Sequence, residues 1–101
     1  MPNPAILSIR GSRQAERVQI SSLAVCRRGD LREEAQLLDL SITGVRLRTF
    51  SRPGVGQRIW IRLPLLEAIE AIVVWKRDNE AGCEFAVPLH PAVFDVVRRA
   101  K

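Results

Sequence analysis

The feature that most constrains the fold is a series of short runs in which apolar and polar residues alternate. Val45 and Leu47 alternate with Arg46 and Arg48, for example, which is the pattern of a β-strand with one buried face. Turn-forming residues separate the runs closely, so we expect antiparallel strands that form a closed or nearly closed barrel, because closure removes exposed sheet edges. The predicted strands cover residues 17–28, 32–40, 43–50, 57–63, 66–76 and 82–87.

Two of these runs are less simple than the others. Residues 31–38 are rich in Glu, Ala, Gln and Leu, which also favour a helix, but turn signals bound the run closely and a strand is preferred. Near the end of the run 66–76, Val73 and Trp75 are of one parity and Ile72 and Val74 of the other. Apolar residues of both parities are typical of a strand buried on both faces, so this strand is expected to be central.

The last eleven residues predict a helix rather than a seventh strand. Pro88 stops the sheet, and Pro91 suits the first turn of a helix. Apolar residues then recur at helical spacing, and we expect this helix to cover one end or edge of the barrel. The fold class is therefore all-β with one C-terminal helix, in which residues 1–12 form an irregular tail and residues 13–101 a single domain.

Composition indicates an aliphatic core and an anionic partner. The chain has 101 residues, of which 47% are hydrophobic but only 5% aromatic, so Val, Ile, Leu and Ala must fill the core. The formal net charge is +5, and all of the 16 basic residues except Lys76 and Lys101 are arginine. The planar guanidinium fork of arginine matches phosphates and guanine edges better than the amine of lysine does.

Other features of the sequence argue against an enzyme and against a membrane protein. Cys26 and Cys83 lie in alternating runs without metal-ligand spacing, so they are expected to be buried free thiols, which fits a reducing cytoplasm. The single histidine, His90, stands at the predicted helix start without a nucleophile nearby, and a surface or capping role is expected for it. We find no signal peptide, no membrane-spanning run and no Gly-rich phosphate loop.

Two short stretches carry chemistry that suits a guanine nucleotide. Asp39 can accept paired hydrogen bonds from the N1–H and the exocyclic amine of guanine, and Ser41 and Gly44 follow it closely. Taken alone, this stretch is a turn, in which glycine would supply a positive φ. Upstream, Arg13 and Arg17 point the same way, whether the segment is helical or extended. Arginine matches O6 and N7 of guanine, or bridges phosphate oxygens.

These two stretches resemble the signatures of the PilZ domain family, which are RxxxR and [D/N]xSxxG. They read Arg13-Gln14-Ala15-Glu16-Arg17 and Asp39-Leu40-Ser41-Ile42-Thr43-Gly44, in that order and at a spacing usual for the family. Further similarity lies in Pro53-Gly54, Val73-Val74-Trp75 and Gly82-Cys83-Glu84-Phe85. The resemblance implies a six-stranded barrel of the split-barrel type with a C-terminal helix.

The resemblance also implies a function and a site. PilZ domains are bacterial receptors for the second messenger cyclic di-GMP, a ligand here and not a catalytic cofactor. Arg13 and Arg17 would bind phosphate and guanine, Asp39 and Ser41 would hold a guanine, and Gly44 would shape the turn. Binding would order the N-terminal arm and signal to a downstream effector protein in the cytoplasm. The sequence leaves open whether one ligand molecule or a stacked pair of them binds.

Two other interpretations compete with this one. A small barrel of net charge +5 could bind single-stranded nucleic acid, but such surfaces use stacking aromatic residues, and only Phe50 and Trp60 qualify among the outward positions. Alternatively, the chain is a protein–protein interaction module without nucleotide binding, and its arginines form salt bridges.

Overall fold

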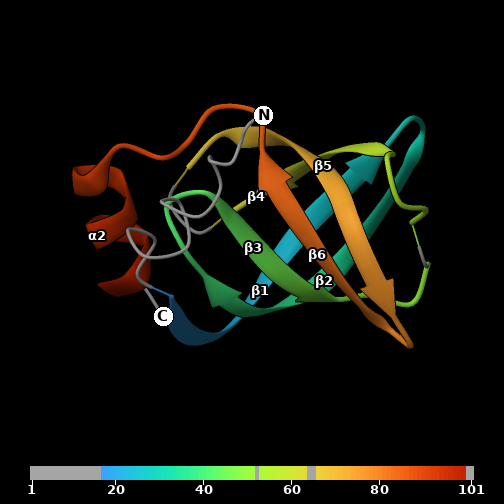
Figure 1. Cartoon of the computed structure of the whole chain (residues 1–101), viewed down its shortest axis with the longest axis horizontal. Coiled ribbons are helices and arrows are strands. Elements are labelled where there is room, and N and C mark those ends of the chain that lie inside the picture. Colours follow the sequence, from blue (N-terminus) through green and yellow to red (C-terminus); the bar gives the residue numbers. More distant parts are fainter. Residues whose placement is uncertain (1–16, 52, 64–65, 100–101) are drawn as a thin grey trace, which may run out of the picture.

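The computed structural model describes residues 17–51, 53–63 and 66–99, and it confirms the predicted fold. Six antiparallel strands close into a barrel in the order β1-β2-β3-β6-β5-β4, and one helix follows them (Figure 1). The elements are β1 (Val18–Arg28), β2 (Leu31–Leu40), β3 (Gly44–Arg48), β4 (Arg58–Arg62), β5 (Ala68–Arg77), β6 (Glu80–Phe85) and α2 (Pro91–Arg99).

Tight turns and one short seam close the barrel. Gly29, with a φ of 59°, makes the turn between β1 and β2, and Asp78, with a φ of 54°, makes the turn between β5 and β6. The seam between β1 and β4 has only the pairs Val25–Arg62, Cys26–Ile61 and Arg27–Trp60. β1 therefore continues beyond the end of β4 on that side.

Aliphatic side chains fill the barrel, as the composition predicts. The inward positions of every strand contribute, because side chains alternate between the two faces of a strand. β2 becomes more buried along its length, also as predicted. The largest side chains with less than 2% exposure include Leu37, Leu40, Leu47, Ile61 and Leu63.

The structure settles the two ambiguous runs. Residues 31–40 form the strand β2, so the helical alternative is wrong. The prediction that the end of β5 is buried on both faces is also wrong, because a β-bulge interrupts its pairing with β6 between Val73 and Trp75. The bulge turns Val74 and Trp75 both outward, with exposed fractions of 47% and 39%. A bulge adds one residue to one strand and re-aims the side chains after it.

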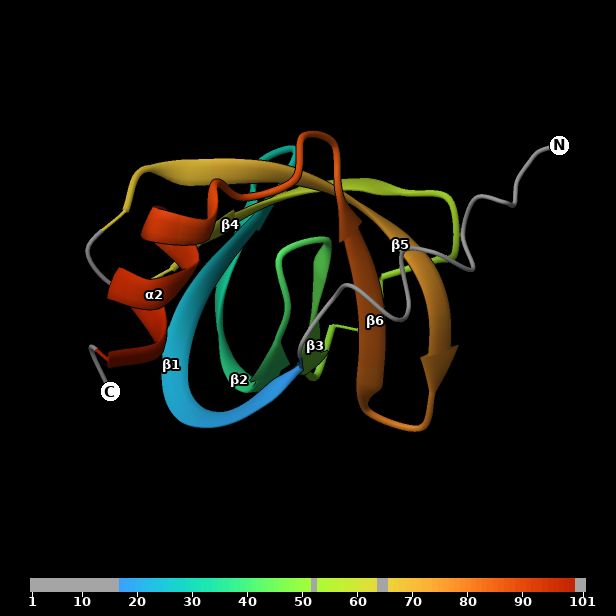
Figure 2. The same ribbon diagram turned by 60° about the vertical axis from the view of Figure 1, so that its left-hand side comes forward.

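The helix α2 lies at one end of the barrel, near the start of β1 (Figures 1 and 2). Phe94 and Val97 are its buried residues and pack into the core. His90 caps the helix as predicted: its Nδ1 accepts a hydrogen bond from the backbone N–H of Ala92 at 3.0 Å. Asp95 binds Arg98 and Arg99 within the helix. Within the described ranges, no helix combines the length and apolar character needed to cross a membrane.

Both cysteines are buried free thiols, as predicted, with exposed fractions of 8% for Cys26 and 4% for Cys83. Burial raises the pKa of each thiol from 9.0 to about 12, with a smaller contribution from the charge of Glu33 at Cys26. We therefore expect neither thiol to react with Ellman's reagent at pH 8 in the native protein, and both to react in guanidinium chloride, because the thiolate is the nucleophile.

The same pKa shifts predict how stability depends on pH. Between pH 9.0 and about 12 the folded thiols keep protons that the unfolded chain has lost, so the free energy of unfolding falls as the pH rises through this window. A native protein that reacts at the rate of an exposed thiol would contradict both expectations.

Candidate functional site

Asp39 is the centre of a network of charged side chains near the end of β2. It is 5% exposed, and each of its carboxylate oxygens accepts a hydrogen bond from an arginine. Arg17 Nη1 donates to Oδ1 at 2.5 Å, and Arg46 Nε donates to Oδ2 at 2.7 Å. Charge-assisted hydrogen bonds of this kind are among the strongest in proteins. The structure thus brings together one residue of each predicted motif, Arg17 and Asp39.

Arg46 connects this carboxylate to a second one across the barrel wall. It lies on β3 between Asp39 on β2 and Gly82 on β6, and its Nη1 also donates to Oε1 of Glu80 at 2.9 Å. Hydrogen bonding to Asp39 is the main reason that the pKa of Arg46 is raised. Two carboxylates therefore hold Arg46 in one orientation beside the site.

Ser41 is fully buried and organises the loop between β2 and β3. Its hydroxyl accepts hydrogen bonds from the backbone N–H of Thr43 at 3.2 Å and of Gly44 at 3.1 Å. Its own N–H donates to the carbonyl of Gly44 at 2.9 Å. Short polar side chains commonly stabilise turns in this way. Ser41 thus fixes the loop that follows Asp39.

Gly44 is required for a different reason from the one that its place in a turn suggests. Among the described glycines, only Gly29 and Gly56 have a positive φ, so the expectation of a positive φ at Gly44 is wrong. Instead, a Cβ at Gly44 would lie 2.3 Å from the carbonyl oxygen of Cys83. Glycine allows the backbones of β3 and β6 to approach closely at this point.

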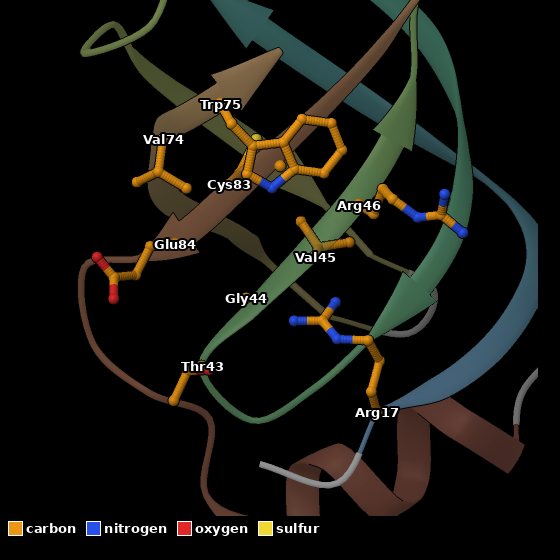
Figure 3. A pocket seen from close by; sticks show the side chains of 10 residues that line it. Arg17, Thr43, Gly44, Val45, Arg46, Val74, Trp75, Cys83 and Glu84 are labelled. Atoms are coloured by element: carbon orange, nitrogen blue, oxygen red, sulfur yellow. The ribbon is translucent and has the colours of Figure 1, made fainter. Parts of the chain in front are cut away.

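A pocket of about 390 Å³ lies next to this network, over β3, β5 and β6. The Trp75 indole and the guanidinium groups of Arg17 and Arg46 border it (Figure 3). The indole lies over Gly82, where a Cβ would come within 2.0 Å of its Nε1. The bulge in β5 and the missing side chain at Gly82 together place an aromatic face in the pocket wall. The lining residues are Arg17, Thr43, Gly44, Val45, Arg46, Val74, Trp75, Gly82, Cys83 and Glu84.

The site therefore differs in part from the predicted one. Arg13 and the tail of residues 1–12 lie outside the described residues. Arg46, Glu80 and Trp75 were not predicted as site residues. Arg46 had a usable signal, since it is the first outward position after Gly44. Trp75 did not, because alternation groups it with Val73, which faces the interior. Among the described residues, no group of His, Cys, Asp and Glu side chains could hold a metal ion.

The chain belongs to the PilZ domain family, whose profile matches residues 12–100. The fold agrees with this assignment: the PlzA protein of Borreliella burgdorferi, solved in complex with c-di-GMP, superposes with a TM-score of 0.68 and 14% sequence identity. The match covers 96% of this chain and 48% of the PlzA chain, so this chain spans about half the length of PlzA. No curated protein sequence matches the chain.

Proposed function

We propose that this protein is a non-enzymatic receptor for cyclic di-GMP. The observation that carries the proposal is the convergence of Arg17 and Arg46 on the buried Asp39, beside a pocket with an exposed indole. A carboxylate, guanidinium groups and an aromatic face are what a guanine nucleotide with phosphates needs. Membership of the PilZ family and the presence of c-di-GMP in the PlzA structure support this ligand.

The proposed binding step is an exchange of hydrogen-bond donors at Asp39. Both of its oxygens accept from arginines in the structure, and Asp39 is only 5% exposed, so a guanine edge that binds Asp39 gains access by replacing one of these donors. The released guanidinium group then turns to a phosphate of the ligand. Arg46 is held by Glu80 as well, whereas the Arg17 side chain is 53% exposed. Arg17 is therefore the donor that moves.

The remaining motif residues have supporting roles in this proposal. Ser41 and Gly44 hold the loop that presents Asp39, and Trp75 stacks on a guanine from the side of β5. Arg13 binds phosphate or guanine together with Arg17. The N-terminal arm thus closes against the barrel around the ligand, and the altered surface signals to an effector protein in the bacterial cytoplasm.

Calorimetric titration tests the ligand and the role of Arg17 together. We expect the wild-type protein to bind cyclic di-GMP in preference to GMP, cyclic di-AMP and short oligonucleotides. Arg17→Ala should lower the affinity roughly 10- to 150-fold, because a hydrogen bond to a charged group contributes about 1.5–3 kcal/mol. Arg99→Ala removes the same charge from an exposed position of α2 and should bind as the wild type does.

The same experiment separates a receptor from a purely structural module. If the ion pair between Arg17 and Asp39 only stabilises the fold, Arg17→Ala lowers the unfolding midpoint and the wild type shows no selective binding. Equal affinity for cyclic di-AMP, or wild-type affinity in Arg17→Ala, would contradict the proposed site.

A further inference from the structure

The barrel wall formed by β1, β2 and β4 carries a row of side chains that the proposed nucleotide site does not use. Strand register places Arg32, Arg27, Trp60 and Glu70 in one line across β2, β1, β4 and β5. In the closed strand order, β1 and β4 lie opposite β6 and β3. This row is therefore on the far side of the barrel from the pocket beside Trp75.

The two arginines of this row repel each other. Arg27 and Arg32 are directly opposite on neighbouring strands, an arrangement that destabilises a sheet. Within the described part of the chain, neither they nor Arg62 form an ion pair with a carboxylate. By contrast, Arg58 Nε lies 2.8 Å from Oε2 of Glu70. An anionic partner that binds here would pair with arginines that have no ion pair with the other described residues, and would relieve the repulsion between Arg27 and Arg32.

Trp60 holds one of these arginines in place. The guanidinium carbon of Arg27 lies 5.7 Å from the centroid of the Trp60 ring, within the range of a cation–π interaction. A side chain that is already fixed loses less conformational entropy when a partner binds. Tryptophan and arginine are also the residues most enriched among those that dominate binding energy at protein interfaces.

A hollow of about 560 Å³, lined mainly by aliphatic residues, adjoins the basic row. It forms where β4 ends at Arg62, because no other described strand pairs with β1 beyond this point on that side. Leu23 and Leu66 line it together with Arg62 and one carboxylate residue, Glu67, and Leu23 is 62% exposed. Cationic groups and an exposed apolar surface therefore lie next to each other.

We propose that this surface, formed by Arg27, Arg32, Trp60, Arg62 and the hollow beside Leu23, binds an acidic segment of a partner protein. Carboxylates of the segment pair with the arginine forks, which suit bidentate recognition, and an apolar side chain enters the hollow. Single-stranded nucleic acid fits less well, since such sites stack successive bases on several aromatic rings. Here Trp60 is the one aromatic residue in the row, and Arg27 lies over its ring.

Fluorescence titration with a synthetic glutamate-rich peptide that contains one central leucine tests this proposal. The chain has 2 tryptophans, so in Trp75→Phe the indole emission reports on Trp60 alone, and the peptide should change it. In that background, Arg27→Ser with Arg62→Ser should weaken binding roughly tenfold or more. Lys76→Ser with Arg77→Ser removes equal charge from the β5–β6 hairpin and should change the affinity less than about twofold.

The outcomes separate the alternatives. Equal losses in the two double variants would show that binding follows net charge alone, and would overturn the proposal. So would tighter binding of a single-stranded oligonucleotide of equal charge, which would make the surface a nucleic-acid site. In amide NMR spectra of the wild type, the peptide should shift Val25, Arg27 and the Trp60 indole, and leave the Trp75 indole unmoved. Because no nucleotide is added, the result is independent of the cyclic di-GMP proposal.

Discussion

Gly44→Ala is expected to lower the free energy of unfolding by about 3 kcal/mol or more, the upper part of the range for atoms added to a packed interior. The added Cβ would lie 2.3 Å from the carbonyl oxygen of Cys83. The clash is with backbone, so no side-chain rotation relieves it. β3 must instead move away from β6, which disturbs the pairing of Gly44 with Glu84 and the packing beneath it.

Thermal unfolding followed by circular dichroism measures this effect. For a domain of this size, about 3 kcal/mol corresponds to a midpoint lowered by roughly 10–20 °C. Gly54→Ala is the matched control, because Gly54 is exposed and a Cβ there meets nothing within 4 Å. It should change the midpoint little. A Gly44→Ala protein as stable as Gly54→Ala would show that β3 and β6 do not approach as closely as described.

Asp39→Asn is expected to reduce the affinity for cyclic di-GMP about 100-fold or more, if the proposed function is right. Asparagine keeps the shape of the side chain but removes the charge and replaces one acceptor by a donor. That donor faces a guanidinium group, from Arg17 or Arg46, and it cannot accept from guanine. Two charge-assisted hydrogen bonds are lost, each worth about 1.5–3 kcal/mol.

Calorimetry well below the unfolding midpoint separates this loss from any loss of stability. Glu34→Gln is the matched control, since it removes the same charge from an exposed position on the same strand, and it should bind as the wild type does. An Asp39→Asn protein that loses less than about tenfold in affinity would show that the ligand does not contact this carboxylate.

Alternation was sufficient to predict the barrel because each strand has one inward face. A period of two residues assigns Leu37, Leu47 and Ile61 to the core without any knowledge of their neighbours. The helix could be predicted for a similar reason, since Pro91 and the spacing of Phe94 and Val97 are local signals.

The site could be predicted only in part, because its remaining features depend on strand register. Nothing in the local sequence indicates that Arg46 meets Glu80, 34 positions away along the chain. Nor can sequence distinguish a glycine with a positive φ from one, such as Gly44, that a neighbouring strand approaches closely. The bulge after Val73 has no local sequence signal either, and it turns Trp75 away from the face of Val73, with which alternation groups it.

That bulge has a consequence for how the pocket wall tolerates a change of length in β5. Val73 pairs with Cys83 and Trp75 with Gly82, so removing Val74 would restore regular pairing and leave the indole facing outward over Gly82. The extra residue instead adds Val74 to the outward face, where it lines the pocket beside the indole. A single-codon deletion at Val74 could therefore remove one apolar side chain from the wall, while Trp75, Arg17 and Asp39 kept their places.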